Sequence, residues 1–220
     1  MKNWKYIPTF FVIILSATIM NAQIKKGLDS RQQSLVKISA LTAIGNLEDL
    51  QLQLNEGLDN GLTINEIKEE LVQLYAYCGF PRSLNAINAF KTVVEDRKAK
   101  GIADSEGEKI ITENNPPDKY EQGRKVLEVL TNTPQIKPAP GFGEFAPRID
   151  AFLKEHLFAD IFASDVLTHQ QRELITIAAL SSMKGVEPQL KSHIAMGRNT
   201  GITDDQLIVL ATVVETIINK

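Results

Sequence analysis

Two residues in the C-terminal third of the chain are best suited to proton-transfer chemistry. His193 lies in a predicted helix with Leu190 and Met196 on the same side, and a positioned imidazole can act as a general acid or base near neutral pH. Glu173 lies in the preceding predicted helix with Ile177 one turn ahead, and a carboxylate held against apolar surface suits proton transfer. Both are candidate catalytic residues. The alternatives are a histidine satisfied in the core and a glutamate in a buried ion pair.

Arg172 and Cys78 are further candidates. Arg172 precedes Glu173 and points about 100° away from it on a helix, so the two do not pair within that helix. Its guanidinium could bind a substrate carboxylate through two hydrogen bonds, or form an intersubunit salt bridge. Cys78, the only cysteine, is predicted at a helix C-terminus, where the helix dipole disfavours a thiolate. We expect Cys78 to pack as a small apolar residue and keep it as a secondary candidate.

The composition excludes several classes of function. The other two histidines, His156 and His169, look like surface residues, and three histidines so spaced form no metal-ligand set, so no metal is predicted. The formal net charge is −3, which does not suggest a nucleic-acid partner.

The candidate residues lie within an internal duplication of the sequence. It aligns the segment L-D-S-R-Q-Q-S-L-V-K-I-S-A-L from Leu28 with L-T-H-Q-Q-R-E-L-I-T-I-A-A-L from Leu167, and the match resumes further along both copies after a one-residue slip. The copies differ at their ionisable positions: the first has Gln33, Ser34 and Gln53 where the second has Arg172, Glu173 and His193. Because these first-copy side chains cannot transfer protons near neutral pH, we expect the first copy to be a scaffold that contributes a wall or a subunit interface to a site in the second.

The duplicated pattern predicts three consecutive helices in each copy. Capping residues three apart begin the first and third helices, at Asp29, Thr63, Thr168 and Thr203. Gly45 and Gly185 are expected to end the first helices, and the second helices should run over 49–60 and 188–200. The first copy adds a helix over 83–98, residues 101–147 form a Pro/Gly-rich connector with one short helix around 120–130, and 149–162 is again helical. No strand-like alternation of useful length appears, so the fold class is all-α.

The N-terminal residues have the layout of a secretory signal peptide. Lys2 and Lys5 precede an apolar run over 6–20 that is short for a membrane span, and Ala22 offers a cleavage site. We expect residues 1–22 to be removed and the protein to be exported, periplasmic or extracellular, with no membrane association after cleavage. The alternative is an uncleaved anchor.

Several segments in order resemble the carboxymuconolactone decarboxylase family. They include R-E-L-I-T-I-A-A-L and L-K-S-H-I-A-M-G-R-N-T-G-I-T in the second copy, and Y-A-Y-C-G-F-P-R-S-L-N-A in the first. The resemblance implies two alkylhydroperoxidase-like helical modules in tandem, residues 23–100 and 148–220, joined by the connector. It also implies a homotrimer, a pseudo-hexamer of modules, with pockets between helices and often between subunits.

The same resemblance bears on the chemistry. One branch of the family is similar to alkylhydroperoxidases with a Cys-x-x-Cys pair, but the corresponding positions here are Val186 and Gln189. The decarboxylase branch fits better, and His193 matches the family's functional histidine. We therefore expect a decarboxylase without a cofactor that acts on a small carboxylated lactone or related acid. The alternatives are a peroxiredoxin-type alkylhydroperoxidase that uses Cys78 alone, and a non-catalytic binding or assembly protein.

Overall fold

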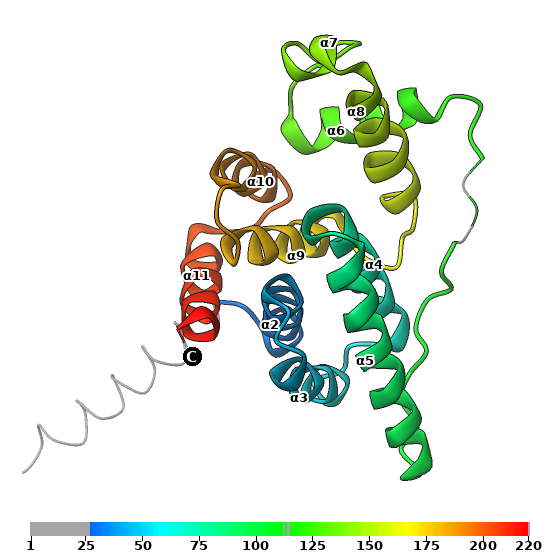
Figure 1. The fold of residues 1–220 in the computed structure, drawn as a ribbon, viewed down its shortest axis with the longest axis vertical. Helices are drawn as coiled ribbons and strands as arrows, with labels where there is room; N and C mark the ends of the chain where they lie inside the picture. The colour runs from blue at the N-terminus through cyan, green and yellow to red at the C-terminus, as the bar shows by residue number, and fades with distance from the viewer. Residues whose placement is uncertain (1–26, 112, 114, 220) are drawn as a thin grey trace, which may run out of the picture.

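The computed structural model describes residues 27–111, 113 and 115–219, which form helices and no strand, as expected (Figure 1). The helices are α2 (Ser30–Ile44), α3 (Leu47–Asp59), α4 (Ile64–Cys78), α5 (Phe80–Ala99), α6 (Lys119–Thr131), α7 (Phe142–Phe145), α8 (Pro147–Ala151), the π-helix η1 (Phe152–Ile161), α9 (His169–Ser181), α10 (Glu187–Asn199) and α11 (Asp204–Ile218). None of these is long and apolar enough to cross a membrane. The predicted signal peptide lies outside the described residues.

Local capping chemistry sets the starts of the repeated helices. Capping boxes are present at all four predicted positions, pairing Asp29 with Gln32, Thr63 with Glu66, Thr168 with Gln171 and Thr203 with Gln206. Gly45 ends α2 in the left-handed conformation, with φ of 78°. The equivalent prediction for Gly185 was only partly right: Gly185 is left-handed, with φ of 82°, but α9 ends at Ser181 and Gly185 lies in the following loop.

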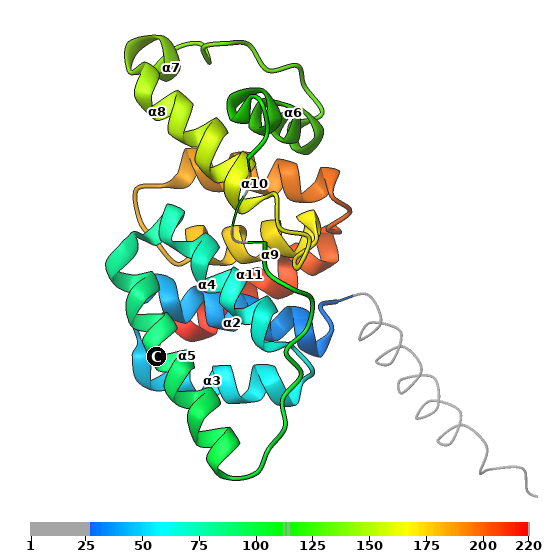
Figure 2. The same cartoon turned by 90° about the vertical axis from the view of Figure 1, so that its right-hand side faces the viewer.

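The two modules are interleaved around α2 and α9. These first helices of the two modules pack on each other at the centre. The third helix of each module then packs on the first helix of the other, α4 on α9 and α11 on α2, as well as on its own (Figures 1 and 2). One buried cluster accordingly joins Leu35 and Leu71 of the first module to Ile175 and Ala179 of the second. A site on α9 is therefore bordered by a helix of the first module.

A helix of the connector packs against the start of the second module. The predicted helix around 120–130 is present as α6, and it packs along η1. Gly123 allows this contact, since a Cβ there would lie 1.8 Å from the Lys154 carbonyl oxygen. The single helix predicted over 149–162 was only partly right, because an α-helix from Pro147 gives way to the π-helix. Figure 2 shows this pair beside α10, where Asn199 donates a hydrogen bond to the Leu130 carbonyl.

A buried carboxyl group on α4 makes the stability of the fold depend on pH. Glu70 is fully buried, and the Ser39 hydroxyl donates a 2.7 Å hydrogen bond to it. Burial, together with the charge of Glu66, raises the pKa of Glu70 well above its usual value, although the Ser39 hydrogen bond opposes the rise. Glu70 is therefore an acid in the folded chain at pH values where an unfolded chain would ionise it.

We predict that Glu70→Gln stabilises the protein increasingly as pH rises. Above an unfolded carboxyl pKa of about 4.3, the unfolded chain releases the Glu70 proton and the folded chain keeps it. The contribution of Glu70 to stability is thus full at lower pH and is lost as pH rises toward the raised pKa. Glutamine keeps the acceptor for Ser39 but does not ionise. Urea unfolding between pH 4 and 8 should show that the free energy of unfolding of Glu70→Gln exceeds that of wild type by an amount that grows as pH rises. The exposed control Glu95→Gln should follow wild type. Parallel curves for the Glu70 variant would contradict this prediction.

Candidate active site

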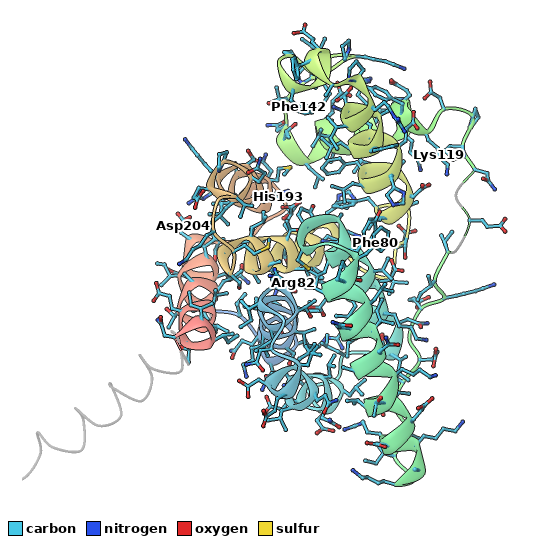
Figure 3. All side chains as sticks on the ribbon, in the orientation of Figure 1. Phe80, Arg82, Lys119, Phe142, His193 and Asp204 are labelled. Atoms are coloured by element: carbon cyan, nitrogen blue, oxygen red, sulfur yellow. The ribbon has the colours of Figure 1, made fainter. Side chains whose placement is uncertain are left out.

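The structure brings together Glu173 and His193, the two residues predicted to transfer protons. Nδ1 of His193 on α10 lies 2.8 Å from Oε2 of Glu173 on α9. Glu173 is fully buried and His193 is 7% exposed. With a hydrogen on Nδ1 bonded to the carboxylate, Nε2 is the nitrogen left to exchange a proton with a bound molecule. Figure 3 shows His193 on the α10 helix, which packs across α9.

A glycine on α10 sets the distance between these two helices. Gly197 lies one turn after His193, and a Cβ at this position would be 2.9 Å from Cδ1 of Ile177 on α9. It would also be 3.8 Å from Cβ of Glu173. A larger residue would require the Ile177 side chain or the helix itself to shift. Gly197 thus permits the close approach of α10 to α9 at which His193 lies within hydrogen-bonding distance of Glu173.

Tyr77 of the first module borders the pair. Its ring meets the His193 imidazole edge-on, with ring centroids 5.3 Å apart and an interplanar angle of 81°. Two oxygen atoms here, the Tyr77 hydroxyl and Glu173 Oε1, are buried and form no hydrogen bond of good geometry with a described residue, although the Thr176 hydroxyl lies beside that of Tyr77. Burial, and to a smaller degree the charge of Glu173, raise the pKa of Tyr77 far above its usual value. The site therefore combines a carboxylate, an imidazole and a protonated phenol.

Arg172 lies at the contact between α9 and α4. It is fully buried, Nη1 donates a 2.9 Å hydrogen bond to Gln73, and Nη2 donates to the Ser164 carbonyl at 2.8 Å. Nη2 also lies 3.2 Å from Glu69, so the salt bridge is intramolecular and joins the two modules. Both terminal nitrogens are thus occupied. In this arrangement Arg172 joins α9 to α4, and its Nε has no hydrogen-bond partner among the described residues; the substrate clamp stays a prediction.

The first module contributes a row of polar side chains on α4 to one side of this site. Glu69, Gln73 and Tyr77 follow one another at four-residue spacing on α4 and therefore share one face. Gln73 donates hydrogen bonds of 2.9 Å to the Arg172 carbonyl and to the Thr176 hydroxyl. Sequence reasoning missed these α4 residues. A comparison of the two copies could have found them, because the equivalent positions on α11 are all apolar: Val209, Val213 and Ile217.

The equivalent region of the first module has no such chemistry. Ser34 donates to the Ser30 carbonyl, Gln33 donates to the Leu28 carbonyl, and the buried oxygen of Gln53 has no partner among the described residues. A cavity of about 640 Å³ lies here, bordered by Gln53 and by Ile217 of α11. No proton-transfer pair equivalent to Glu173 and His193 is present at these positions.

The remaining candidates lie elsewhere. Cys78 is half-buried and its thiol donates to the Leu74 carbonyl at 3.1 Å; burial raises its pKa, which disfavours the thiolate. His156 is exposed, as predicted, and pairs with Asp160 at 3.2 Å. His169 was predicted at the surface but is half-buried beside the Phe162 ring. Within the described part of the chain, no group of three or more His, Cys, Asp or Glu is placed to hold a metal ion.

Comparison with known proteins gives partial matches to three relatives. The chain is 33% identical over 72 residues to 4-carboxymuconolactone decarboxylase of Acinetobacter baylyi, which covers 33% of this chain and 54% of that protein. It is 29% identical over 77 residues to nitrosuccinic acid decarboxylase of Metarhizium robertsii, covering 35% of this chain and 54% of the relative. It is also 29% identical over 72 residues to an uncharacterised protein of Methanocaldococcus jannaschii, covering 33% of this chain and 67% of that protein. The chain thus spans about half the length of the two decarboxylases.

The family model for carboxymuconolactone decarboxylases matches both halves of the duplication. The matched segments are residues 15–92 and 147–218. They leave out most of the connector, and together they cover well over half of the chain. With two matched segments and the all-helical tandem architecture, this chain belongs to the carboxymuconolactone decarboxylase family.

Proposed function

We propose that this protein is a cofactor-independent decarboxylase of a small carboxylated lactone or a related acid. The observation that carries the proposal is the buried hydrogen bond between Glu173 and His193, which leaves one imidazole nitrogen for a substrate. Two relatives support the reaction class, since their names specify decarboxylation of a carboxylated lactone and of nitrosuccinic acid. Both names describe an acid that also carries an electron-withdrawing group, a lactone or a nitro group.

Such a group removes the need for a cofactor. When the bond between the substrate and its carboxylate breaks, the electron pair stays on the substrate carbon and spreads onto the neighbouring electron-withdrawing group. Carbon dioxide leaves, and one proton must be added to the resulting anion. Protonated His193 donates this proton from Nε2, while ionised Glu173 stabilises the imidazolium through Nδ1. The step involves no net oxidation or reduction.

The peroxide-reducing alternative receives no support from the surroundings of Cys78. A peroxidatic cysteine needs its thiolate, and here burial raises the thiol pKa while the thiol donates to a backbone carbonyl. A non-catalytic binding or assembly protein would keep the same fold and would differ from our proposal only in that it turns over no substrate.

An activity screen with a matched variant pair tests the proposal. The protein lacking residues 1–22 should release carbon dioxide from at least one member of a panel of lactone carboxylic acids, keto acids and nitro acids. Glu173→Gln should lower that kcat by about 10²-fold or more, because the neutral amide no longer stabilises the imidazolium. Glu215→Gln, an exposed change on α11, should match wild type. Absence of turnover across the panel would favour a binding protein.

Export and assembly belong to the same proposal. We propose an exported protein that forms a homotrimer, on the basis of the signal-like N-terminus and the family resemblance. Light scattering of the purified protein should give the mass of three chains. Cell fractionation should place the processed protein outside the cytoplasm.

A further inference from the structure

The hydroxyl of Tyr77 is a buried polar group that is poorly satisfied by the fold. It is buried at the Glu173–His193 pair, where the Thr176 hydroxyl lies beside it but no hydrogen bond of good geometry is formed with a described residue. A buried hydroxyl left without a partner destabilises a fold by roughly 1–3 kcal/mol. A phenylalanine would fill the same space without that penalty. The hydroxyl is therefore not explained by packing.

The duplication points to the same residue independently. The counterpart of Tyr77 on α11 is Ile217, which borders the cavity beside Gln53 in the first module. Gln53 is in turn the counterpart of His193. The copy that lacks the histidine thus also lacks the phenol, although the two residues come from different modules. Tyr77 and His193 therefore occur together as parts of one site.

We propose that Tyr77 is a substrate-binding residue, whose hydroxyl donates a hydrogen bond to an oxygen of the acid held at His193. This inference rests on the proposed function and names the group of the first module that completes the site. The raised pKa keeps the phenol protonated at working pH, so it acts as a donor. A phenol suits this role because both terminal nitrogens of Arg172 already contact Glu69, Gln73 and Ser164. It supplies a donor to a carboxylate or a carbonyl without adding a charge.

The test compares two tyrosines on the same helix. Tyr77→Phe removes one oxygen atom and keeps the ring against His193. Tyr75→Phe is the matched control, because Tyr75 stacks on Phe80 with centroids 4.4 Å apart and borders a cavity that neither Tyr77 nor His193 lines. Figure 3 labels Phe80 at the start of α5. The probe is γ-carboxy-γ-butyrolactone, a saturated lactone acid that has no conjugated system to accept electrons and so binds without reacting.

Calorimetric titration with this probe should show Tyr77→Phe binding roughly 10- to 100-fold more weakly than wild type. Tyr75→Phe should bind like wild type. The melting temperature of ligand-free Tyr77→Phe should stay close to that of wild type, since the hydroxyl forms no hydrogen bond of good geometry in the free protein. Equal affinity of Tyr77→Phe and wild type, a lowered melting temperature, or no binding of the probe to wild type would each overturn the inference. If wild type binds the probe and Tyr77→Phe does not, but no acid is decarboxylated, the proposed function fails and the binding role of Tyr77 stands.

Discussion

Replacing His193 with alanine is expected to lower kcat for decarboxylation by about 10²- to 10⁴-fold, the range typical of a positioned general acid or base. The imidazole is hydrogen-bonded to the Glu173 carboxylate through Nδ1, which leaves Nε2 for proton transfer. Rapid quench or continuous carbon dioxide release, with the substrate identified by the screen, measures the effect. Because the proton is added in the step that follows bond cleavage, the loss should appear in kcat more than in KM.

Two matched variants make this expectation specific. His193→Gln gives the second module the residue that the first module has at the same position, Gln53. It should be as inactive as the alanine variant, because an amide cannot deliver a proton. His156→Ala removes an exposed histidine that pairs with Asp160 on η1 and should retain wild-type kcat. Activity of His193→Gln within a few-fold of wild type would show that the imidazole does not transfer the proton.

Much of the fold could be predicted because its determinants are local. Capping residues three apart, such as Thr203 and Gln206, mark helix starts wherever they occur, and the structure has capping boxes at all four predicted sites. The end of α9 was missed because Gly185 was assumed to play the part of Gly45. The π-helix within 149–162 was missed for a different reason. Its periodicity is close to that of an α-helix, and its geometry depends on packing against α6.

Only the part of the candidate site that lies within the second module could be predicted from the sequence. Glu173 and His193 lie on consecutive helices of the second copy, so their proximity follows from the helical hairpin. Glu69, Gln73 and Tyr77 lie about a hundred residues away in sequence, on a helix whose pairing with α9 depends on interleaving of the two modules. No local sequence pattern specifies that the third helix of each module packs on the first helix of the other. The contacts of Arg172 could not be predicted for this same reason, since Glu69 and Gln73 belong to the other module.

Arg172→Met is therefore expected to destabilise the fold by about 3–5 kcal/mol, as breaking a buried ion pair does when one charge is left behind. The guanidinium is fully buried and its partner Glu69 has a side chain 8% exposed, so water does not replace the lost interaction at Glu69. Guanidinium chloride unfolding followed by circular dichroism measures the change. Arg198→Met is the control, because its pair with Asp204 is exposed and should contribute at most about 1 kcal/mol.

A double variant separates this structural role from the substrate clamp predicted from sequence. Arg172→Met combined with Glu69→Met removes both charges and leaves side chains of similar length, so a substantial part of the lost stability should return. Gln73 would still hold α4 to the Thr176 hydroxyl. If Arg172 instead bound the substrate, the single variant would keep its stability and lose affinity for the lactone acid, and the second substitution would restore nothing. Recovery of stability in the double variant would place Arg172 in the junction between the modules, where it orients the helix that carries Glu173.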